Sequence, residues 1–178
     1  MAEYRLTVAG LGPGDAGLIT RETWARIEGA EHILLRTRIH PTVAALDAAG
    51  ITYETYDAFY EVAEDFDELY ERIVDDLLER ASKMDLLYLV PGSPFVAERT
   101  VQILRARAME EGRPIEILPA MSFLEVLFAA LSLDPVNGLS IVDAMDEDAI
   151  AGCFEPFDKK SFAKLLDARV SQKIGGEK

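Results

Sequence analysis

Short apolar runs alternate along the chain with longer segments in which apolar residues recur every three or four positions. The runs predict strands, and the segments between them predict amphipathic helices. The predicted strands cover residues 4–10, 32–35, 51–55, 86–90, 115–118 and 139–142. The predicted helices cover residues 20–29, 41–49, 66–82, 95–111, 122–133 and 159–173. This alternation predicts a doubly wound α/β fold, with a mostly parallel sheet of about five strands covered on both faces.

Capping residues stand at the ends of several predicted helices. Thr20 and Ser122 come immediately before apolar-periodic segments, where a hydroxyl accepts a hydrogen bond from a free backbone amide. Gly50 and Gly112 follow the last periodic residues of two other helices, a common place for glycine. One face of the predicted helix over residues 66–82 carries Phe66, Leu69, Ile73, Leu77 and Leu78. Its opposite face is acidic and is expected to lie in solvent, so we predict no metal site there.

The composition restricts the classes of function. At 178 residues, of which 49% are apolar, the chain is long enough for one domain with a substantial core. The net charge of −14 opposes nucleic-acid backbones and anionic membranes, and no apolar run approaches the roughly 20 residues that span a bilayer. Cys153 is the one cysteine and the N-terminus lacks a signal-peptide pattern, which favours the cytoplasm. The expected partners are small molecules or other proteins.

Three predicted strands end in loops rich in glycine and proline, over residues 10–15, 91–94 and 119–122. Parallel strands present their carboxyl ends at one edge of a sheet, so we expect the three loops to lie together. Any one of these loops is an ordinary turn. Three at one edge predict a ligand site.

Residues 12–17 also match the dinucleotide-binding pattern G-x-G-x-x-G. Pro13 removes a backbone amide donor, and Asp15 places a negative charge where a pyrophosphate would lie. The acidic residue expected about 20 residues later is missing, because the second predicted strand runs into Arg36. We therefore do not predict a dinucleotide site.

The three loops carry motifs of a known family. Residues 10–15, Gly-Leu-Gly-Pro-Gly-Asp, with Leu18-Ile19-Thr20 after them, resemble the opening motif of the tetrapyrrole (corrin/porphyrin) methylases. Residues 91–94, Pro-Gly-Ser-Pro, resemble the glycine-aspartate-proline loop of that family. Residues 119–122, Pro-Ala-Met-Ser, resemble its P-G-x-S segment. Because the three motifs occur in the family's order, the resemblance is fairly specific.

The resemblance extends over residues 3–143 and is strongest to one branch of the family. Residues 35–41 and 96–101 look most similar to the branch in which the methylase domain is fused to a MazG-type nucleotide pyrophosphohydrolase. The family implies methyl transfer from S-adenosylmethionine by direct displacement at the methyl carbon, and it also implies a homodimer. The acceptor is expected to be a small molecule, which the sequence does not identify.

The resemblance also assigns roles to individual residues. It places the cofactor contacts on Pro13, Gly92, Ser93, Phe95, Val96 and Ser122. Asp15 is the candidate for a catalytic or substrate-orienting role. Arg36 and His40 follow a strand end and are candidates for substrate contact, although an ion pair and a helix start explain them equally well.

Two departures from the family affect these expectations. Ser93 stands where the family has aspartate. The family's second α/β domain also has no recognisable counterpart, so we expect an N-terminal domain over residues 1–143 and a loop-plus-helix tail over residues 144–178. The alternative to an active methyltransferase is a binding or dimerisation module that needs a partner chain to complete its cleft.

Overall fold

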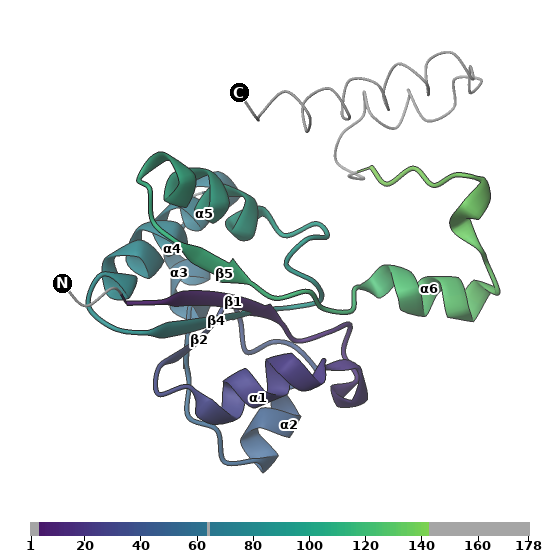
Figure 1. The fold of residues 1–178 in the computed structure, drawn as a ribbon, viewed down its shortest axis with the longest axis horizontal. Coiled ribbons are helices and arrows are strands. Elements are labelled where there is room, and N and C mark those ends of the chain that lie inside the picture. The colour runs from purple at the N-terminus through teal and green to yellow at the C-terminus, as the bar shows by residue number, and fades with distance from the viewer. Residues whose placement is uncertain (1–3, 64, 143–178) are drawn as a thin grey trace. The chain divides into compact units, whose positions relative to one another are not determined.

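The computed structural model describes residues 4–63 and 65–142. The chain divides into two compact units, Met1–Leu133 and Asp134–Lys178. The described strands and α-helices all belong to the first unit (Figure 1). The described part of the second unit contains one short 3₁₀ helix, η2, at Pro135–Asn137. Within the described residues, no helix is long and apolar enough to cross a membrane.

A five-stranded parallel sheet forms the centre of the first unit, as the sequence predicts. Its strands are β1 (Leu6–Gly10), β2 (Ile33–Leu35), β3 (Glu54–Thr55), β4 (Leu86–Val90) and β5 (Ile115–Ile117). Their spatial order is β3-β2-β4-β1-β5. Val8 at the middle of β1 pairs with Tyr88 on one side and with Ile117 on the other. β1 and β4 are therefore both interior strands, and they lie next to each other.

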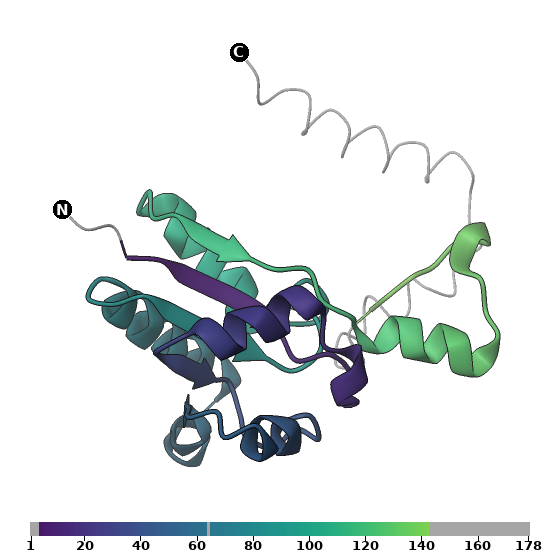
Figure 2. The same cartoon turned by 60° about the horizontal axis from the view of Figure 1, so that its bottom comes forward.

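Helices cover both faces of the sheet, which confirms the doubly wound prediction. One face is covered by α1 (Arg21–Gly29) and α2 (Val43–Ala48), and the other by α3 (Asp57–Val62), α4 (Phe66–Ala81) and α5 (Arg99–Glu110) (Figure 1). The turned view in Figure 2 shows the same two layers on either side of the strands. A sixth helix, α6 (Phe123–Leu131), follows β5.

Successive side chains of β4 point to opposite faces of the sheet, so one apolar run packs against two helical layers. Tyr88 and Val90 belong to the core cluster that contains the buried residues of α4 and α5. Leu87 and Leu89 belong to the cluster that contains Ile27 of α1 and residues of α2. Successive strand side chains point to opposite faces, so a strand buried on both sides must be apolar throughout.

The predicted helix caps are confirmed. The Thr20 side chain accepts a hydrogen bond from the Thr23 amide at 3.1 Å. Ser122 forms a capping box with Glu125 at the start of α6. Gly50 follows α2 with a φ of +70°, which glycine adopts without a steric penalty. Local polar groups thus fix these helix ends.

Several predicted boundaries are wrong. Residues 139–142 form no strand, and Leu139, Ile141 and Val142 are exposed. α5 begins at Arg99 rather than at residue 95, because residues 91–98 remain in the loop after β4.

The remaining differences concern smaller features. α2 begins at Val43, after the proline rather than beside it. Phe66 is exposed and stacks on Tyr70, so it does not join the buried stripe of α4. Helix α3 has no counterpart in the predictions. The predicted tail over residues 144–178 lies outside the described residues.

The last residue of β1 is the most crowded glycine in the described chain. A Cβ atom built on Gly10 would lie 2.2 Å from the Gly92 carbonyl oxygen, 2.7 Å from Ala120 Cβ and 2.9 Å from Pro94 Cδ. The first of these neighbours is backbone and cannot move independently of the loop. Gly10 is therefore required by the close passage of two other chain segments.

We predict that Gly10→Ala destabilises the protein by about 3 kcal/mol or more, because the methyl group must displace the backbone of residue 92. Gly29→Ala at the end of α1 is the matched control, since a Cβ there would meet nothing within 4 Å. That control is expected to be neutral or to stabilise by up to about 1 kcal/mol. Urea unfolding of the full chain measures both variants. Equal stabilities for the two would contradict the crowding at Gly10.

Candidate functional site

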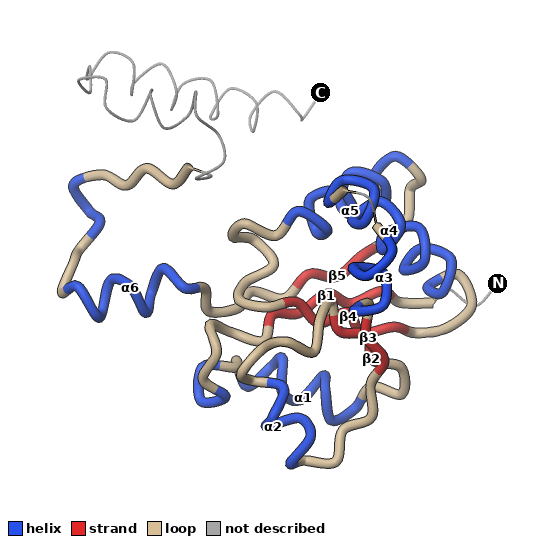
Figure 3. The backbone as a smooth tube through the Cα atoms, turned by 180° about the vertical axis from the view of Figure 1, so that it is seen from behind, coloured by secondary structure: helices blue, strands red, loops and turns tan. Residues whose placement is uncertain are grey.

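The three glycine- and proline-rich loops leave adjacent strands at one edge of the sheet. The first follows β1, the second follows β4, and the third follows β5 (Figure 3). α1 continues from β1 on one face of the sheet, whereas α5 continues from β4 on the other face (Figure 1). Neighbouring strands whose connections go to opposite faces define a topological switch point, where ligands bind in open α/β sheets. We call this edge the rim, formed by residues 10–15, 91–96 and 119–122.

Backbone hydrogen bonds join the first two loops of the rim. The Gly12 amide donates to the Gly92 carbonyl at 3.1 Å, and the Gly92 amide donates to the Gly12 carbonyl at 3.0 Å. The Leu11 amide donates to the Val90 carbonyl at 2.8 Å, which extends the pairing of β1 and β4 beyond the strands. Gly12 and Gly92 both have positive φ, at +71° and +66°. Glycine is thus suited to both positions of this bridge.

The third loop reaches the first through Ala120, whose Cβ lies 2.7 Å from the Cβ position of Gly10, beside the Gly92 carbonyl and Pro94 of the second loop. The Leu118 amide donates to the Val8 carbonyl at 2.9 Å, so this loop leaves the sheet beside β1. The prediction that the three loops converge is therefore confirmed. Residues more than 100 positions apart in the chain are brought within van der Waals contact.

The predicted cofactor residues of the second loop differ in their environments. Ser93 is only 4% exposed, and its Oγ accepts a hydrogen bond from the Phe95 amide at 3.3 Å. Phe95 is 54% exposed, with the Arg105 guanidinium 6.0 Å from its ring centroid. A Cβ on Gly92 would project into open space, with no atom within 4 Å. The loop thus has a buried polar anchor, an exposed aromatic ring and an accessible backbone.

Ser122 and Asp15 both have structural tasks at the rim. Ser122 Oγ donates to Glu125 Oε2 at 2.7 Å and accepts from the Leu124 amide at 3.1 Å, which begins α6. Asp15 is exposed, and its Oδ1 accepts from the Gly17 amide at 2.8 Å, which caps the 3₁₀ helix η1 at Ala16–Leu18. Pro13, also in the first loop, is half-buried.

Arg36 connects the end of β2 to the end of the second loop. Its Nη1 donates to Glu98 Oε2 at 2.7 Å, and Glu98 is only 3% exposed. The other Glu98 oxygen accepts from the Thr100 hydroxyl, which lies 3.2 Å from the Tyr88 hydroxyl. Burial is the largest single influence and lowers the pKa of Arg36, but Glu98 together with the nearby tyrosines raises that pKa overall. This ion pair fixes the position at which the second loop enters α5.

Unsatisfied polar atoms gather after β2 and β3. Within residues 4–63 and 65–142, the buried side-chain atoms without a hydrogen-bond partner are Arg36 Nε, His40 Nδ1, Thr42 Oγ1 and Tyr60 OH. Burial lowers the pKa of His40, so the neutral imidazole is favoured near pH 7. The neighbouring Pro41 lies 3.6 Å from the Cβ position of Gly14, which puts residues 40–42 beside the rim. An ordered water, a bound group or local strain accounts for such atoms in folded proteins.

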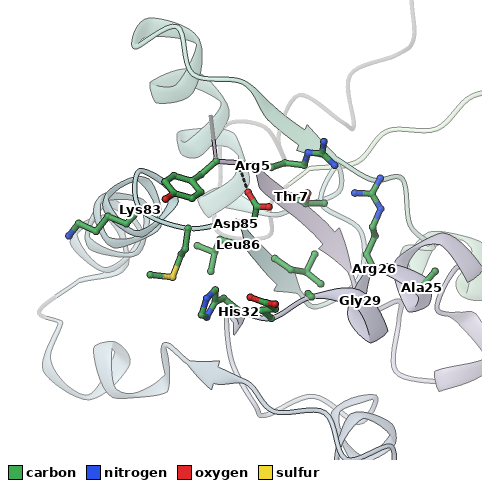
Figure 4. Close-up of a pocket in the computed structure, with 14 residues that line it drawn as sticks. Arg5, Thr7, Ala25, Arg26, Gly29, His32, Lys83, Asp85 and Leu86 are labelled. Carbon is green, nitrogen blue, oxygen red and sulfur yellow. Dashed lines mark hydrogen bonds between the residues drawn. The ribbon is translucent and has the colours of Figure 1, made fainter. Parts of the chain in front are cut away.

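A cavity of about 530 Å³ lies at the opposite edge of the sheet, where the strands begin (Figure 4). Its lining includes Arg5, Arg26 and Asp85, which Figure 4 shows as sticks. Several charged side chains of this cavity already have partners, some of them outside its lining. Arg26 forms a bidentate pair with Glu116 at 2.8 Å, and Asp85 accepts from the Arg5 amide at 2.7 Å. The cavity is remote from all three loop motifs and contributes nothing to the rim.

The acidic face of α4 is occupied by ion pairs. Arg107 of α5 contacts both Glu71 and Asp75, at 3.4 and 3.0 Å. Asp76 accepts from the Tyr56 hydroxyl at 2.7 Å and pairs with Arg80. In the part of the chain that the structure describes, no group of three acidic, histidine or cysteine side chains is arranged to hold a metal ion.

The sequence does not indicate three contributors to this edge. Tyr60 lies on the unpredicted helix α3, and Thr42 lies inside a predicted helix. Glu98 also lies inside a predicted helix, and 62 residues separate it from its partner Arg36. No local pattern in the sequence indicates such an ion pair. A charged residue directly after an apolar strand, such as Arg36, does indicate a charged group at the edge of the sheet.

Comparison with known proteins agrees with this arrangement. The sequence model of the Tetrapyrrole (Corrin/Porphyrin) Methylases matches residues 5–167. The uncharacterized protein YabN of Bacillus subtilis is 37% identical over 140 residues, which cover 79% of this chain and 29% of YabN. The chain thus spans less than a third of this curated relative.

Three solved structures share the fold at identities of 20–22%. Uroporphyrin-III-C-methyltransferase from Thermus thermophilus has a TM-score of 0.57, with 75% of this chain and 55% of that chain covered. Diphthine synthase has a TM-score of 0.55, with coverages of 72% and 49%. The cobalamin biosynthetic enzyme cobalt precorrin-4 methyltransferase has a TM-score of 0.54, with coverages of 78% and 53%. This chain therefore spans about half the length of each of these structures.

Three observations agree: the order of the loop motifs, the rim that the loops form, and the family match over most of the sequence. The chain belongs to the tetrapyrrole (corrin/porphyrin) methylase family.

Proposed function

We propose that the rim binds S-adenosylmethionine and that the protein transfers its methyl group to a small-molecule acceptor. The observation that carries this proposal is the convergence of three family motifs around Gly10 and the Gly12–Gly92 bridge. Membership of the methylase family supports the reaction class. The switch-point location supports a ligand at this edge rather than at the edge where the strands begin.

Each predicted cofactor residue has a physical reason for its proposed role. Gly92, Ser93 and Val96 would offer backbone groups to the charged methionine end of the cofactor. Phe95 would lie against the adenine, because its exposed ring provides an apolar face. The Pro13 ring and the Ser122 backbone would bound the ligand from the other two loops, since the Ser122 hydroxyl is already used in the capping box.

The proposed reaction is a direct displacement. An electron pair of the acceptor forms the new bond to the methyl carbon, the carbon–sulfur bond breaks, and S-adenosylhomocysteine leaves with the electrons of the broken bond on sulfur. A displacement of this kind depends on alignment and exclusion of water more than on a strong acid or base. The proposed cofactor residues of the rim suit this task, because they can position the ligand and enclose it without carrying a charge themselves.

The acceptor is proposed to lie on the side of Arg36 and His40. Arg36 is already neutralised by Glu98, so it would donate to an oxygen of the acceptor through Nε rather than act as a free cation. His40 has an unpartnered Nδ1 and would form a neutral hydrogen bond. Asp15 uses Oδ1 in its cap, so we assign an orienting contact to Oδ2.

The context of the domain is also part of the proposal. A partner chain is proposed to complete the cleft, either in a homodimer, as the family resemblance implies, or as a docking module without catalysis. We also propose, from the resemblance of residues 35–41 and 96–100, that the chain belongs to the MazG-fused branch. A cytoplasmic location is supported by the single cysteine.

We predict that S-adenosylhomocysteine and S-adenosylmethionine bind the purified chain with micromolar dissociation constants, measured by isothermal titration calorimetry. Because a partner chain is proposed to complete the cleft, the affinity should be at the weak end of that range at low protein concentration, where the partner dissociates. The absence of heat at millimolar cofactor would contradict the proposed cofactor and favour the non-catalytic module.

We predict that Gly92→Ala weakens cofactor binding at least tenfold, because its Cβ would enter the space assigned to the ligand. Gly112→Ala is a closely matched control, with a φ of +65° against +66° and nothing within 4 Å of its Cβ. Both substitutions should cost about 1–2 kcal/mol of stability through the left-handed backbone. Calorimetry and urea unfolding measure the two effects. A similar loss of affinity in both variants would remove Gly92 from the site.

We predict that His40 makes the folded protein less stable in mild acid. Its pKa is lowered by burial, so below the unfolded value of about 6.5 the unfolded chain takes up a proton more readily than the folded chain. The contribution of His40 to the free energy of unfolding is therefore complete above about pH 6.5. This contribution declines as the pH falls below that value and through the lower pKa of the folded state. Urea unfolding at pH 7.5 and pH 5.5 should show a smaller acid loss for His40→Gln than for the unmodified chain. An equal loss would mean that the imidazole titrates alike in both states.

A further inference from the structure

The second loop of the rim ends in an unusual backbone conformation. Within residues 4–63 and 65–142, two residues other than glycine have a positive φ, Ala97 at +53° and Ser132 at +52°. Ser132 directly follows α6, and the end of a helix is a common place for a left-handed residue. Ala97 instead precedes α5, where no helix end accounts for this conformation. A left-handed alanine is strained, and such strain persists only where the surrounding structure imposes it.

The next residue, Glu98, occupies the N-cap position of α5 without capping the helix. Within the described chain, its side chain accepts no hydrogen bond from the amides of the first turn of α5. Asp65 at the same position of α4 accepts one from the Glu68 amide. The buried carboxylate of Glu98 instead accepts from Arg36 Nη1 at 2.7 Å and from the Thr100 hydroxyl. Glu98 thus lacks a local contact that stabilises a helix start and contacts a residue 62 positions away.

The backbone angles of Ala97 set how the second loop is oriented. Before this residue, the Val96 amide donates to the Ser93 carbonyl at 3.1 Å, which closes a turn within the loop. After it, the Glu98 carbonyl accepts from the Gln102 amide at 3.2 Å, in the first turn of α5. Ala97 therefore joins two segments that are each held by their own hydrogen bonds. A change of φ at this one position would swing the loop relative to the helix.

We propose that Glu98 is a positioning residue for the second loop. Through its ion pair with Arg36, Glu98 holds Ala97 in the left-handed conformation and keeps residues 91–96 in the orientation that meets the cofactor. This inference rests on the proposed function, which assigns that loop to the cofactor. A loop that is ordered before binding gives a higher affinity, because its ordering is not paid for when the ligand arrives.

The backbone preference of residue 97 determines the size of the effect. Without the ion pair, an alanine is expected to occupy the left-handed region in about a tenth of the molecules or fewer. The apparent affinity falls in proportion to the fraction of molecules in the binding-competent conformation. Glycine adopts positive φ about as readily as negative φ, so glycine at position 97 keeps about half of the molecules competent. A substitution at position 97 should therefore compensate for one at position 98.

Isothermal titration calorimetry of the full chain with S-adenosylhomocysteine tests this compensation. Glu98→Gln keeps the shape of the side chain but removes its charge, and we expect it to raise the dissociation constant about tenfold. Glu116→Gln is the matched control, because it disrupts a bidentate pair with Arg26 outside the rim, and it should stay within about twofold. The double substitution Ala97→Gly and Glu98→Gln should return to within about threefold of the unmodified chain. A merely structural Glu98 would show no such rescue, because glycine adds no contact.

A second measurement needs no cofactor. A strong nuclear Overhauser effect between the amide and α protons of one residue indicates a positive φ, and we expect it at Ala97 in the ligand-free chain. This signal should weaken in Glu98→Gln and remain in Glu116→Gln. Thr100→Val is a milder substitution that leaves the Arg36 pair in place, and it should weaken the signal less. It replaces Glu98→Gln in both measurements if that variant does not fold, which urea unfolding determines.

Three results would overturn the proposal: an Ala97 signal that Glu98→Gln and Thr100→Val leave unchanged, equal weakening of binding by Glu98→Gln and Glu116→Gln, or no recovery in the double substitution. The failure of the proposed cofactor site gives a different result, because the unmodified chain would then bind no S-adenosylhomocysteine. The Ala97 signal would still show in that case whether the ion pair holds the loop.

Discussion

The carboxyl ends of β1 and β4 approach each other so closely that residue 10 has no room for a side chain. Three segments depend on this approach: the loop after β1, the loop after β4, and the loop that passes Ala120 over Gly10. The reciprocal backbone bonds of Gly12 and Gly92 hold the first two at a fixed separation. The sheet order makes these strands neighbours, and their helices leave on opposite faces. This geometry forms the rim at a topological switch point, which is where open α/β sheets bind ligands.

Much of this arrangement is predictable from the sequence, because buried positions recur along the chain as a periodic pattern of apolar residues. The run over residues 86–90 is apolar throughout since it faces two helical layers, and the structure confirms it as β4. The similar run over residues 139–142 is not a strand, because apolar character alone does not provide a neighbouring strand. Ser122 was placed correctly as a cap. The Ser122 hydroxyl donates a hydrogen bond to Glu125, so the cofactor contact predicted for Ser122 is proposed for its backbone alone.

The features that could not be predicted depend on contacts between distant residues. Arg36 and Glu98 pair across 62 positions, and neither residue has a local signal that identifies the other. The unsatisfied atoms of His40, Thr42 and Tyr60 appear only when the loops after β2 and β3 are folded together. These residues border the rim, and the exposed helix α6 begins at it. Within the described residues, the unsatisfied polar atoms and the exposed helix α6 therefore lie at the same end of the sheet as the family motifs.

The central claim is that S-adenosylmethionine and its product lie on the rim formed by residues 10–15, 91–96 and 119–122. A titration of the ¹⁵N-labelled chain with S-adenosylhomocysteine, followed by amide chemical shifts, tests it most directly. The account predicts that the largest shifts fall on these three loops together, with little change around Arg26 and Asp85 at the opposite edge. Shifts concentrated at that opposite cavity, or none at millimolar ligand, would contradict it.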